Sequence, residues 1–355
     1  MAYTLRGGLY IEKAATDMMV AADTEEMVSE PGWVRREAWP RRNSDQLSQI
    51  IRVRSIEDQL RIYDPSASFA NPTDIQEVDF ELGDDVRIKV LPFALETVID
   101  YVESAAADPI IDYAAEKTQD AKFKFFASLE KIAADRLRDP SVMTNGRNLL
   151  PAERLDNYAS PQSNPILLMY QLDQQFRNDL GGQPDKVFMD ELVWRYGFQL
   201  HPYVIARAPV HVLASGPPAG ATMTVGLLEA MLGWRPGTIV LTDKRYNPAR
   251  KGEPEARRSY LGSDIIAVRT GQNRRYQGFG VETAFTGLAD LPTDYPMAVL
   301  TWEDPKRGLF GSTRVRMVSL INWSVLRPRS AYRLSGVVDI TDTAKYYYLG
   351  QPVLN

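Results

Sequence analysis

The chain of 355 residues contains no cysteine and only two histidines. The missing thiols exclude disulfide bonds, thiolate catalysis and zinc sites built on sulfur. Neither His201 nor His211 has a second histidine or a carboxylate at the spacing of metal ligands, so we expect no bound metal. His201 precedes a proline at the end of a helical stretch, where we expect it to cap the last carbonyl groups.

Long apolar runs and an excess of positive charge are also missing. No stretch of 18 apolar residues is present, which predicts that no segment spans a membrane. Lysine and arginine total 41 against 46 aspartates and glutamates, a net charge of −5, which argues against a dedicated nucleic-acid-binding protein. Basic clusters such as Arg257-Arg258 and Arg274-Arg275 are therefore expected to pair with acidic residues across subunit boundaries.

Signatures of catalysis and of cofactor binding do not occur. The motifs G-x-S-x-G, the Walker loop and G-x-G-x-x-G are absent. Residues 278–283 (GFGVET) lack the third glycine and follow a polar stretch, which predicts a loop. No nucleophile, base and orienting group can be assembled, so we expect no cofactor and no enzymatic activity.

What is present indicates a folded protein of two or three domains, with 44% hydrophobic and 25% charged residues. One long helix is predicted over residues 109–138. Asp108 can cap its start, Pro109 suits the first helical position, and no further proline or glycine occurs before Pro140. Apolar side chains recur along it at steps of mostly three or four residues, which predicts one buried face.

The first ninety residues lack a core of their own. Residues 1–48 hold one short helical stretch and then two tryptophans beside four arginines, a combination that can stack on nucleic-acid bases. We favour an arm that lies on a neighbouring surface, with tryptophan packing and arginine pairing with carboxylates. Residues 49–91 alternate as a β-ribbon, with strands at 51–54, 59–63, 78–82 and 86–90 and a turn at Asp84-Asp85. A ribbon with so little core must lie on something else.

The remainder predicts a mixed α+β fold. Helices are expected over 93–107, 164–180, 190–201 and 224–232. Strands are expected over 186–189, 238–242, 265–268, 297–302, 313–322 and 331–340.

The order of these elements resembles the major capsid proteins of tailed double-stranded DNA bacteriophages, which share the HK97-like capsid fold. The segments that carry the resemblance are residues 91–96 (LPFALE), 107–110 (ADPI), 163–166 (SNPI), 186–189 (KVFM), Trp194 and His201-Pro202. The resemblance implies an N-terminal arm (1–48), an E-loop β-ribbon (49–91) and a peripheral (P) domain (92–208) that contains the spine helix (109–138). It further implies an axial (A) domain (209–292) and return strands of the peripheral domain with a C-terminal tail (293–355).

The same resemblance implies a structural protein whose hexamers and pentamers form an icosahedral shell. Its partners would be copies of itself and packaged double-stranded DNA, held non-specifically, together with portal, scaffolding or decoration proteins. Its place would be the virion, after assembly in the host cytoplasm. Some relatives join subunits covalently through a ribbon lysine, but residues 64–74 contain none and the ribbon has only Lys89, so we expect a noncovalent shell. The candidate contacts between subunits are Trp33, Arg35, Arg36, Trp39, Arg41, Arg42, Arg52, Arg54, Arg61 and Phe69.

Two alternatives are also compatible with the sequence. An encapsulin-like compartment would keep the fold and enclose a cargo enzyme in place of DNA. An α/β enzyme would use Asp190, Glu191 and His201 near the Gly278 loop and would form a small oligomer with a deep pocket.

Overall fold

The computed structural model describes residues 33–54, 82–106, 113–205, 223–249, 257–271, 278–285, 297–308, 310–339, 347–348 and 351–352. The predicted strand at 59–63, residues 78–81 of the predicted strand at 78–82, the ribbon tip, Asp108, Pro109 and His211 lie outside these ranges. The described α and 3-10 or π helices are α2 (Val34–Ala38), α5 (Tyr101–Ala106), α6 (Tyr113–Arg138), α7 (Pro165–Leu180), α8 (Glu191–Trp194), η1 (Arg195–Gln199), α9 (Pro202–Ile205), α10 (Val225–Leu232) and η3 (Pro328–Ser330).

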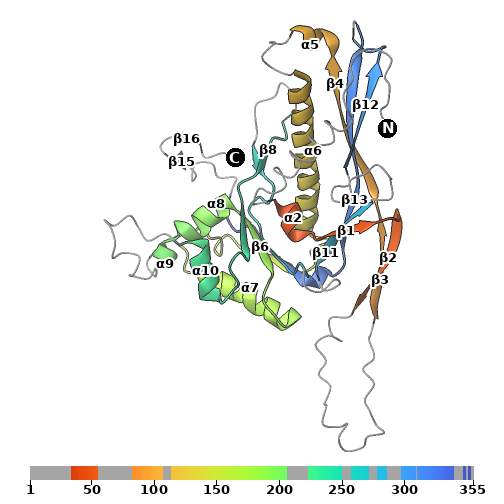
Figure 1. Cartoon of the computed structure of the whole chain (residues 1–355). Helices are drawn as coiled ribbons and strands as arrows, with labels where there is room; N and C mark the ends of the chain where they lie inside the picture. The colour runs from red at the N-terminus through yellow and green to blue at the C-terminus, as the bar shows by residue number, and fades with distance from the viewer. Residues whose placement is uncertain are drawn as a thin grey trace, which may run out of the picture.

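One five-stranded sheet has the order β1-β11-β13-β12, with β4 also paired to β13. Its strands are β1 (Arg41–Ser44), β4 (Leu91–Asp100), β11 (Gly280–Phe285), β12 (Met297–Asp304) and β13 (Ser312–Val325). The long strand β13 runs antiparallel to β4, β11 and β12, whereas β1 is parallel to β11. Figure 1 shows α6 upright beside the long strands β4, β12 and β13.

The second five-stranded sheet has the order β5-β14-β10-β6-β7. Its strands are β5 (Gly146–Asn148), β6 (Lys186–Asp190), β7 (Ile239–Thr242), β10 (Ile265–Val268) and β14 (Ala331–Ser335). Because β6 and β7 pair in this sheet, strands on both sides of the predicted domain boundary at residue 209 belong to one layer. Short two-stranded pairs complete the described strands: β2 (Ser48–Arg54) with β3 (Leu82–Lys89), β8 (Arg245–Tyr246) with β9 (Arg258–Ser259), and β15 (Tyr347–Tyr348) with β16 (Gln351–Pro352).

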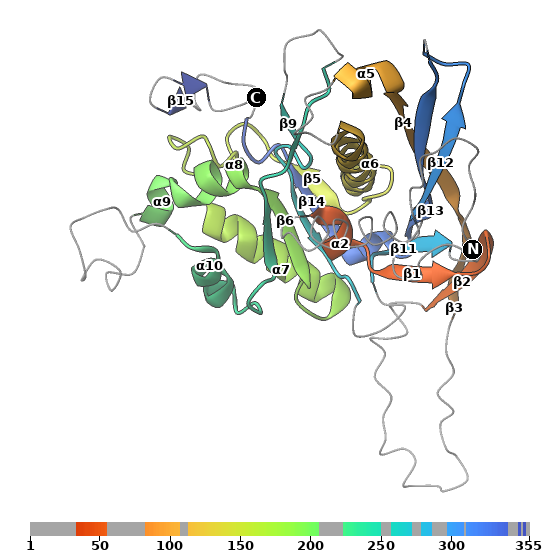
Figure 2. The ribbon, with the colours of Figure 1, turned by 45° about the horizontal axis from the view of Figure 1, so that its top comes forward.

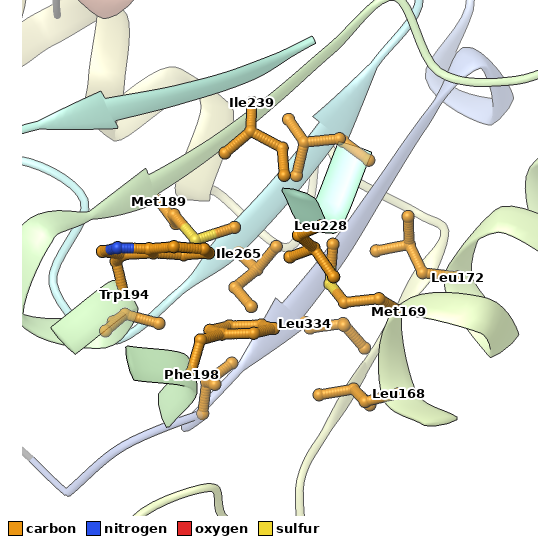
Figure 3. Packing of buried hydrophobic residues seen from close by; sticks show 14 of the residues in the cluster. Leu168, Met169, Leu172, Met189, Trp194, Phe198, Leu228, Ile239, Ile265 and Leu334 are labelled. Atoms are coloured by element: carbon orange, nitrogen blue, oxygen red, sulfur yellow. The ribbon is translucent and has the colours of Figure 1, made fainter. Parts of the chain in front are cut away.

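Both faces of the second sheet are covered, which explains its continuous apolar strands. Val187 and Met189 of β6 belong to a core with α7, α8 and α10, whereas Phe188 between them belongs to the core around α6. The first of these cores is shown in Figure 3, where Trp194 and Phe198 lie among residues from the helices and the sheet; their rings stack with centroids 5.3 Å apart. Helix α6 therefore lies between the two sheets and packs its buried face against strands of both (Figure 2).

Local signals predicted several elements correctly. Asn164 accepts a hydrogen bond from the Leu167 amide and caps α7, and Gly181 ends the helix with a φ of 66°. Within the described residues α6 ends at Arg138 as predicted, and its buried face includes Phe125, Leu129 and Leu137.

Three predictions about local structure are wrong. Residues 91–100 form strand β4 and not a helix, so the helix predicted over 93–107 is reduced to α5. Residues 280–285 form the buried strand β11 and not a loop. Asp84 and Asp85 lie inside β3 and not in a turn. In each case pairing with a strand remote in the sequence decides the conformation, which local propensity cannot report.

Candidate assembly surface

The segment of residues 33–44, which we call the arm segment, lies on its own subunit. Helix α2 packs against α6, and β1 extends the first sheet through β11. Trp33 and Trp39 are only 8% and 1% exposed, and the ring of Trp39 lies 5.3 Å from that of Phe279. Both rings are therefore covered within their own chain, and Trp39 is part of the core around α6. Contact of either tryptophan with another copy stays a prediction.

Two of the predicted contact residues converge on one buried carboxylate of the same chain. The Arg35 guanidinium donates to both carboxylate oxygens of Glu282 at 2.5 and 2.9 Å, and Arg41 donates to Oε1 at 3.0 and 3.1 Å. Trp323 adds its indole N–H at 2.9 Å. Burial acts to raise the pKa of Glu282, but the two guanidiniums outweigh it and hold the pKa below its ordinary value.

A second buried carboxylate receives the start of α2. Glu130 of α6 is 1% exposed and accepts hydrogen bonds from the backbone N–H groups of Val34 at 2.6 Å and Arg35 at 3.0 Å. Sequence analysis missed both Glu130 and Glu282. For Glu130 a signal exists, since Phe126 and Ala134 stand four residues to either side of it on the buried face.

The other predicted contact residues divide into two groups. Arg36 is exposed and Arg42 is half-buried on the arm segment, so both present charge at the surface. Arg52 and Arg54 lie in β2, where only the backbone is described, and Arg61 and Phe69 lie outside the described residues. Contact of these side chains with another copy stays a prediction.

The base of the ribbon has one covered and one open face. On the inner face Ile51 and Ile88 are 3% and 0% exposed and pack with Val281 and Leu326. On the opposite face of β2, Ile50 is 63% exposed, because successive side chains of a strand point to opposite faces. Two further large apolar side chains are exposed at the base of the ribbon, Leu47 just before β2 (54%) and Leu91 just after β3 (44%). The ribbon therefore packs on its own chain through one face, and Ile50 on the other face is uncovered. We call Ile50, with Leu47 and Leu91 at the base, the outer ribbon patch.

Two residues of the enzymatic alternative, Asp190 and His201, have structural roles, whereas Glu191 is exposed at the start of α8. Asp190 caps α8 through the Leu192 amide and pairs with Arg245 and the Ser259 hydroxyl. His201 is buried, hydrogen-bonds Ser163 at 3.0 Å and accepts from the Tyr203 amide at 3.2 Å. The His201 side chain therefore caps the start of α9. The prediction that it caps the last carbonyl groups of the preceding helix is wrong. Burial lowers the pKa of His201, which favours the neutral ring that this acceptor role needs.

The described residues hold neither a metal site nor a membrane-spanning helix. In the part of the chain that the structure describes, no group of three or more histidine, aspartate or glutamate side chains is placed to hold a metal ion. Across the same ranges, no helix has the length and apolar character needed to cross a membrane.

No family model and no curated protein matches the chain. Several solved structures do match it. The match to a phage-related protein from Bordetella bronchiseptica covers 86% of this chain and 92% of that protein, with a TM-score of 0.60 at 16% identity. The virus-like particle of Pyrococcus furiosus covers 90% and 99%, with a TM-score of 0.50 at 10% identity. The capsid structure of the cyanophage P-SCSP1u covers 94% and 91%, with a TM-score of 0.48 at 10% identity.

At these identities the likeness establishes the fold. It extends over most of this chain and over nearly all of each matched chain. The chain therefore has the mixed α+β fold of the HK97-like capsid structures, as the resemblance in its sequence implied.

Proposed function

We propose that this protein is the shell-forming subunit of a phage head, and that its hexamers and pentamers close an icosahedral capsid around double-stranded DNA. The observation that carries the proposal is the match to a subunit of a virus-like particle over 90% of this chain and 99% of that one. A likeness that leaves almost none of the other chain unmatched supports use of the whole subunit in the same kind of assembly.

The outer ribbon patch supports self-association. Soluble monomers carry scattered apolar side chains, but three large exposed ones on and at the base of one narrow ribbon are what a surface covered in an assembly would present. Among its described residues the ribbon has two strands, β2 and β3, and a two-stranded ribbon is marginally stable by itself. Packing against a further copy would supply the apolar contacts that its outer face lacks.

Assembly is tested directly by expressing the full chain in bacteria and examining the purified protein by negative-stain electron microscopy and light scattering. We expect uniform closed particles with a mass many times the 40.0 kDa of the chain. A monodisperse monomer or small oligomer across a range of protein and salt concentrations would overturn the proposal and favour the enzymatic alternative.

An encapsulin-like compartment is the second candidate, since the fold serves both uses. Particles purified from the native source distinguish them by their contents. We expect nuclease-protected duplex DNA in the particle, whereas a co-purified folded enzyme in place of DNA would favour the compartment. The net charge of −5 supports a wall that holds DNA without binding it tightly. Isolated subunits should therefore retain duplex DNA weakly, and strong salt-sensitive retention would contradict this part of the proposal.

A phage head also implies additional partners. Portal, scaffolding and decoration proteins would associate with the shell, and the protein would reside in the virion after assembly in the host cytoplasm. No cofactor or membrane partner is part of this proposal.

A further inference from the structure

The arm segment is held by two buried carboxylates in unlike surroundings. Glu282 faces the guanidinium groups of Arg35 and Arg41, so its negative charge is compensated. Glu130 receives two neutral backbone N–H groups from the start of α2, at 2.6 and 3.0 Å. A carboxylate that is out of water and bound by neutral donors retains much of the free-energy cost of burying its charge.

The charged and titratable groups around Glu130 come from three elements. Arg35 of α2 attracts its negative charge, but that guanidinium is hydrogen-bonded to Glu282. Glu282 of β11 repels it. Tyr260, which lies between β9 and β10, also interacts with it electrostatically. Two further cations near the segment have other contacts: Lys244 lies over the Trp33 ring at 5.4 Å, and Lys186 pairs with Glu37 at 2.8 Å.

The arm segment is also placed where it can separate from the body. Strand β1 has four residues and stands at the end of the strand order in its sheet, and α2 has five residues. Separation would break the pairing with β11 alone and would leave the pairing of β11 with β13 intact. Short edge elements of this kind can open as a local unit while the rest of the sheet stays folded.

We propose that Glu130 and the start of α2 form a proton-dependent clasp, in which docking of the arm segment takes up a proton and is therefore tighter at pH 6 than at pH 8.5.

The direction of this pH dependence follows from the linkage between proton binding and docking. Burial raises the pKa of Glu130 from 4.5 to about 7, against the opposing effect of the two N–H groups and of Arg35. In the undocked state, with the carboxyl returned to water, its pKa falls back toward the ordinary value. The docked state therefore binds more protons between these two values, so docking weakens as pH rises through 7. With this difference in the pKa of Glu130 between the docked and undocked states, the docking equilibrium constant should fall by up to about tenfold between pH 6 and pH 8.5.

Hydrogen-exchange mass spectrometry of the full-length protein tests the clasp. Protection factors are measured at pH 6, 7 and 8.5 for peptides that cover residues 34–44, corrected for the intrinsic exchange rate, with a peptide of α7 as internal reference. In the wild type we expect the protection of 34–44 relative to α7 to fall between threefold and tenfold from pH 6 to pH 8.5. An unchanged ratio in the wild type overturns the proposal, whether or not any variant folds.

The variant Glu130→Gln resembles the protonated side chain and should lose this pH dependence while keeping the segment docked at pH 8.5. The matched control is Glu229→Gln, because Glu229 is also a buried glutamate that accepts two backbone N–H groups, from Gly237 at 3.2 Å and Ile239 at 2.7 Å, but lies in the other core. It should leave the response of 34–44 unchanged. A wild-type pH response in Glu130→Gln, or its loss in Glu229→Gln, would contradict the assignment to Glu130.

Discussion

Gly280 lies directly under the ring of Trp39. A Cβ atom at position 280 would stand 2.3 Å from Cζ3 of Trp39 and 2.9 Å from the carbonyl oxygen of Ser324. The close approach lets the indole ring fill the space where β11 begins, beside Phe279. A glycine is thus required here by packing, and it is what allows the arm segment to enter the core.

The first prediction concerns Gly280→Ala. The added methyl group must displace the Trp39 ring or the backbone of β13, and overpacking of this kind costs about 1–3 kcal/mol of unfolding free energy. We expect a lower midpoint in urea, measured by circular dichroism. The control is Gly226→Ala in α10, where no atom lies within 4 Å of the added Cβ and a helical alanine is favoured over glycine. An equal decrease of the urea midpoint in both variants would show that the contact with the Trp39 ring is unimportant.

The second prediction concerns acid stability. Glu282→Gln removes the partner of two guanidiniums in a buried site, and breaking such a pair costs about 3 kcal/mol at pH 7. The pKa of Glu282 is lowered in the folded protein, so its contribution is fully present above the ordinary value of 4.5 and is lost as pH falls below it. The difference in melting temperature between wild type and variant should therefore be constant from pH 7 to 5 and should narrow below 4.5.

The matched control for this experiment is Glu96→Gln. Glu96 also pairs with two arginines, Arg314 and Arg316, but at the surface of the first sheet, where water screens the interaction. Its effect at pH 7 should be much smaller. A difference between wild type and Glu282→Gln that stays constant down to pH 3 would contradict the linkage argument.

The predictable parts of the fold are those with local causes. Asn164, Pro165 and Gly181 mark both ends of α7 in the sequence alone, and the structure has the same ends. The four apolar residues of β10 indicate a strand with both faces covered, and its two neighbours and two cores confirm it.

The unpredicted parts depend on remote partners. Residues 91–100 include alanine, leucine and glutamate, which favour a helix, yet ten successive pairings with β13 make them a strand. Glu282 is an unfavourable residue for a buried strand until Arg35 and Arg41 are placed beside it, and these stand 247 and 241 residues away in the sequence. Steps of two between Phe93, Leu95, Thr97 and Ile99 were the signal for β4 that the helix prediction overlooked.

The third prediction compares a buried with an exposed ion pair. Asp264 accepts from Arg138 at 3.0 Å and from Arg333 at 3.0 and 3.1 Å, and so joins the end of α6 to the second sheet. Asp264→Asn should cost about 2–4 kcal/mol of unfolding free energy, because both guanidinium groups lose the negative carboxylate with which they pair. Asp135→Asn breaks the exposed pair with Lys131 on the same helix and should cost less than about 0.5 kcal/mol. Equal urea midpoints for the two variants would contradict this account.

The fourth prediction tests the outer ribbon patch. Ile50 is 63% exposed, so Ile50→Asp should leave the melting temperature of dissociated subunits within about 2 °C of the wild type. If another copy covers this face, the same variant should reduce the yield of closed particles at least tenfold in electron micrographs. Ile51→Asp on the inner face is the matched control, because its side chain is 3% exposed and its loss should lower the melting temperature itself. Normal particle yield from Ile50→Asp would show that this face remains open in the shell.

The last prediction is that the shell is held together without covalent bonds between subunits. Cross-linking through the ribbon would require a lysine that can reach a neighbour, and residues 55–81 contain none. Lys89, the ribbon's single lysine, lies at the end of β3 opposite Ser48, at the base where the ribbon meets its own subunit. Purified particles boiled in detergent should therefore give one band at 40.0 kDa by gel and by mass spectrometry. A ladder at multiples of that mass would show cross-linking, and its persistence in Lys89→Arg would place the bond outside the ribbon.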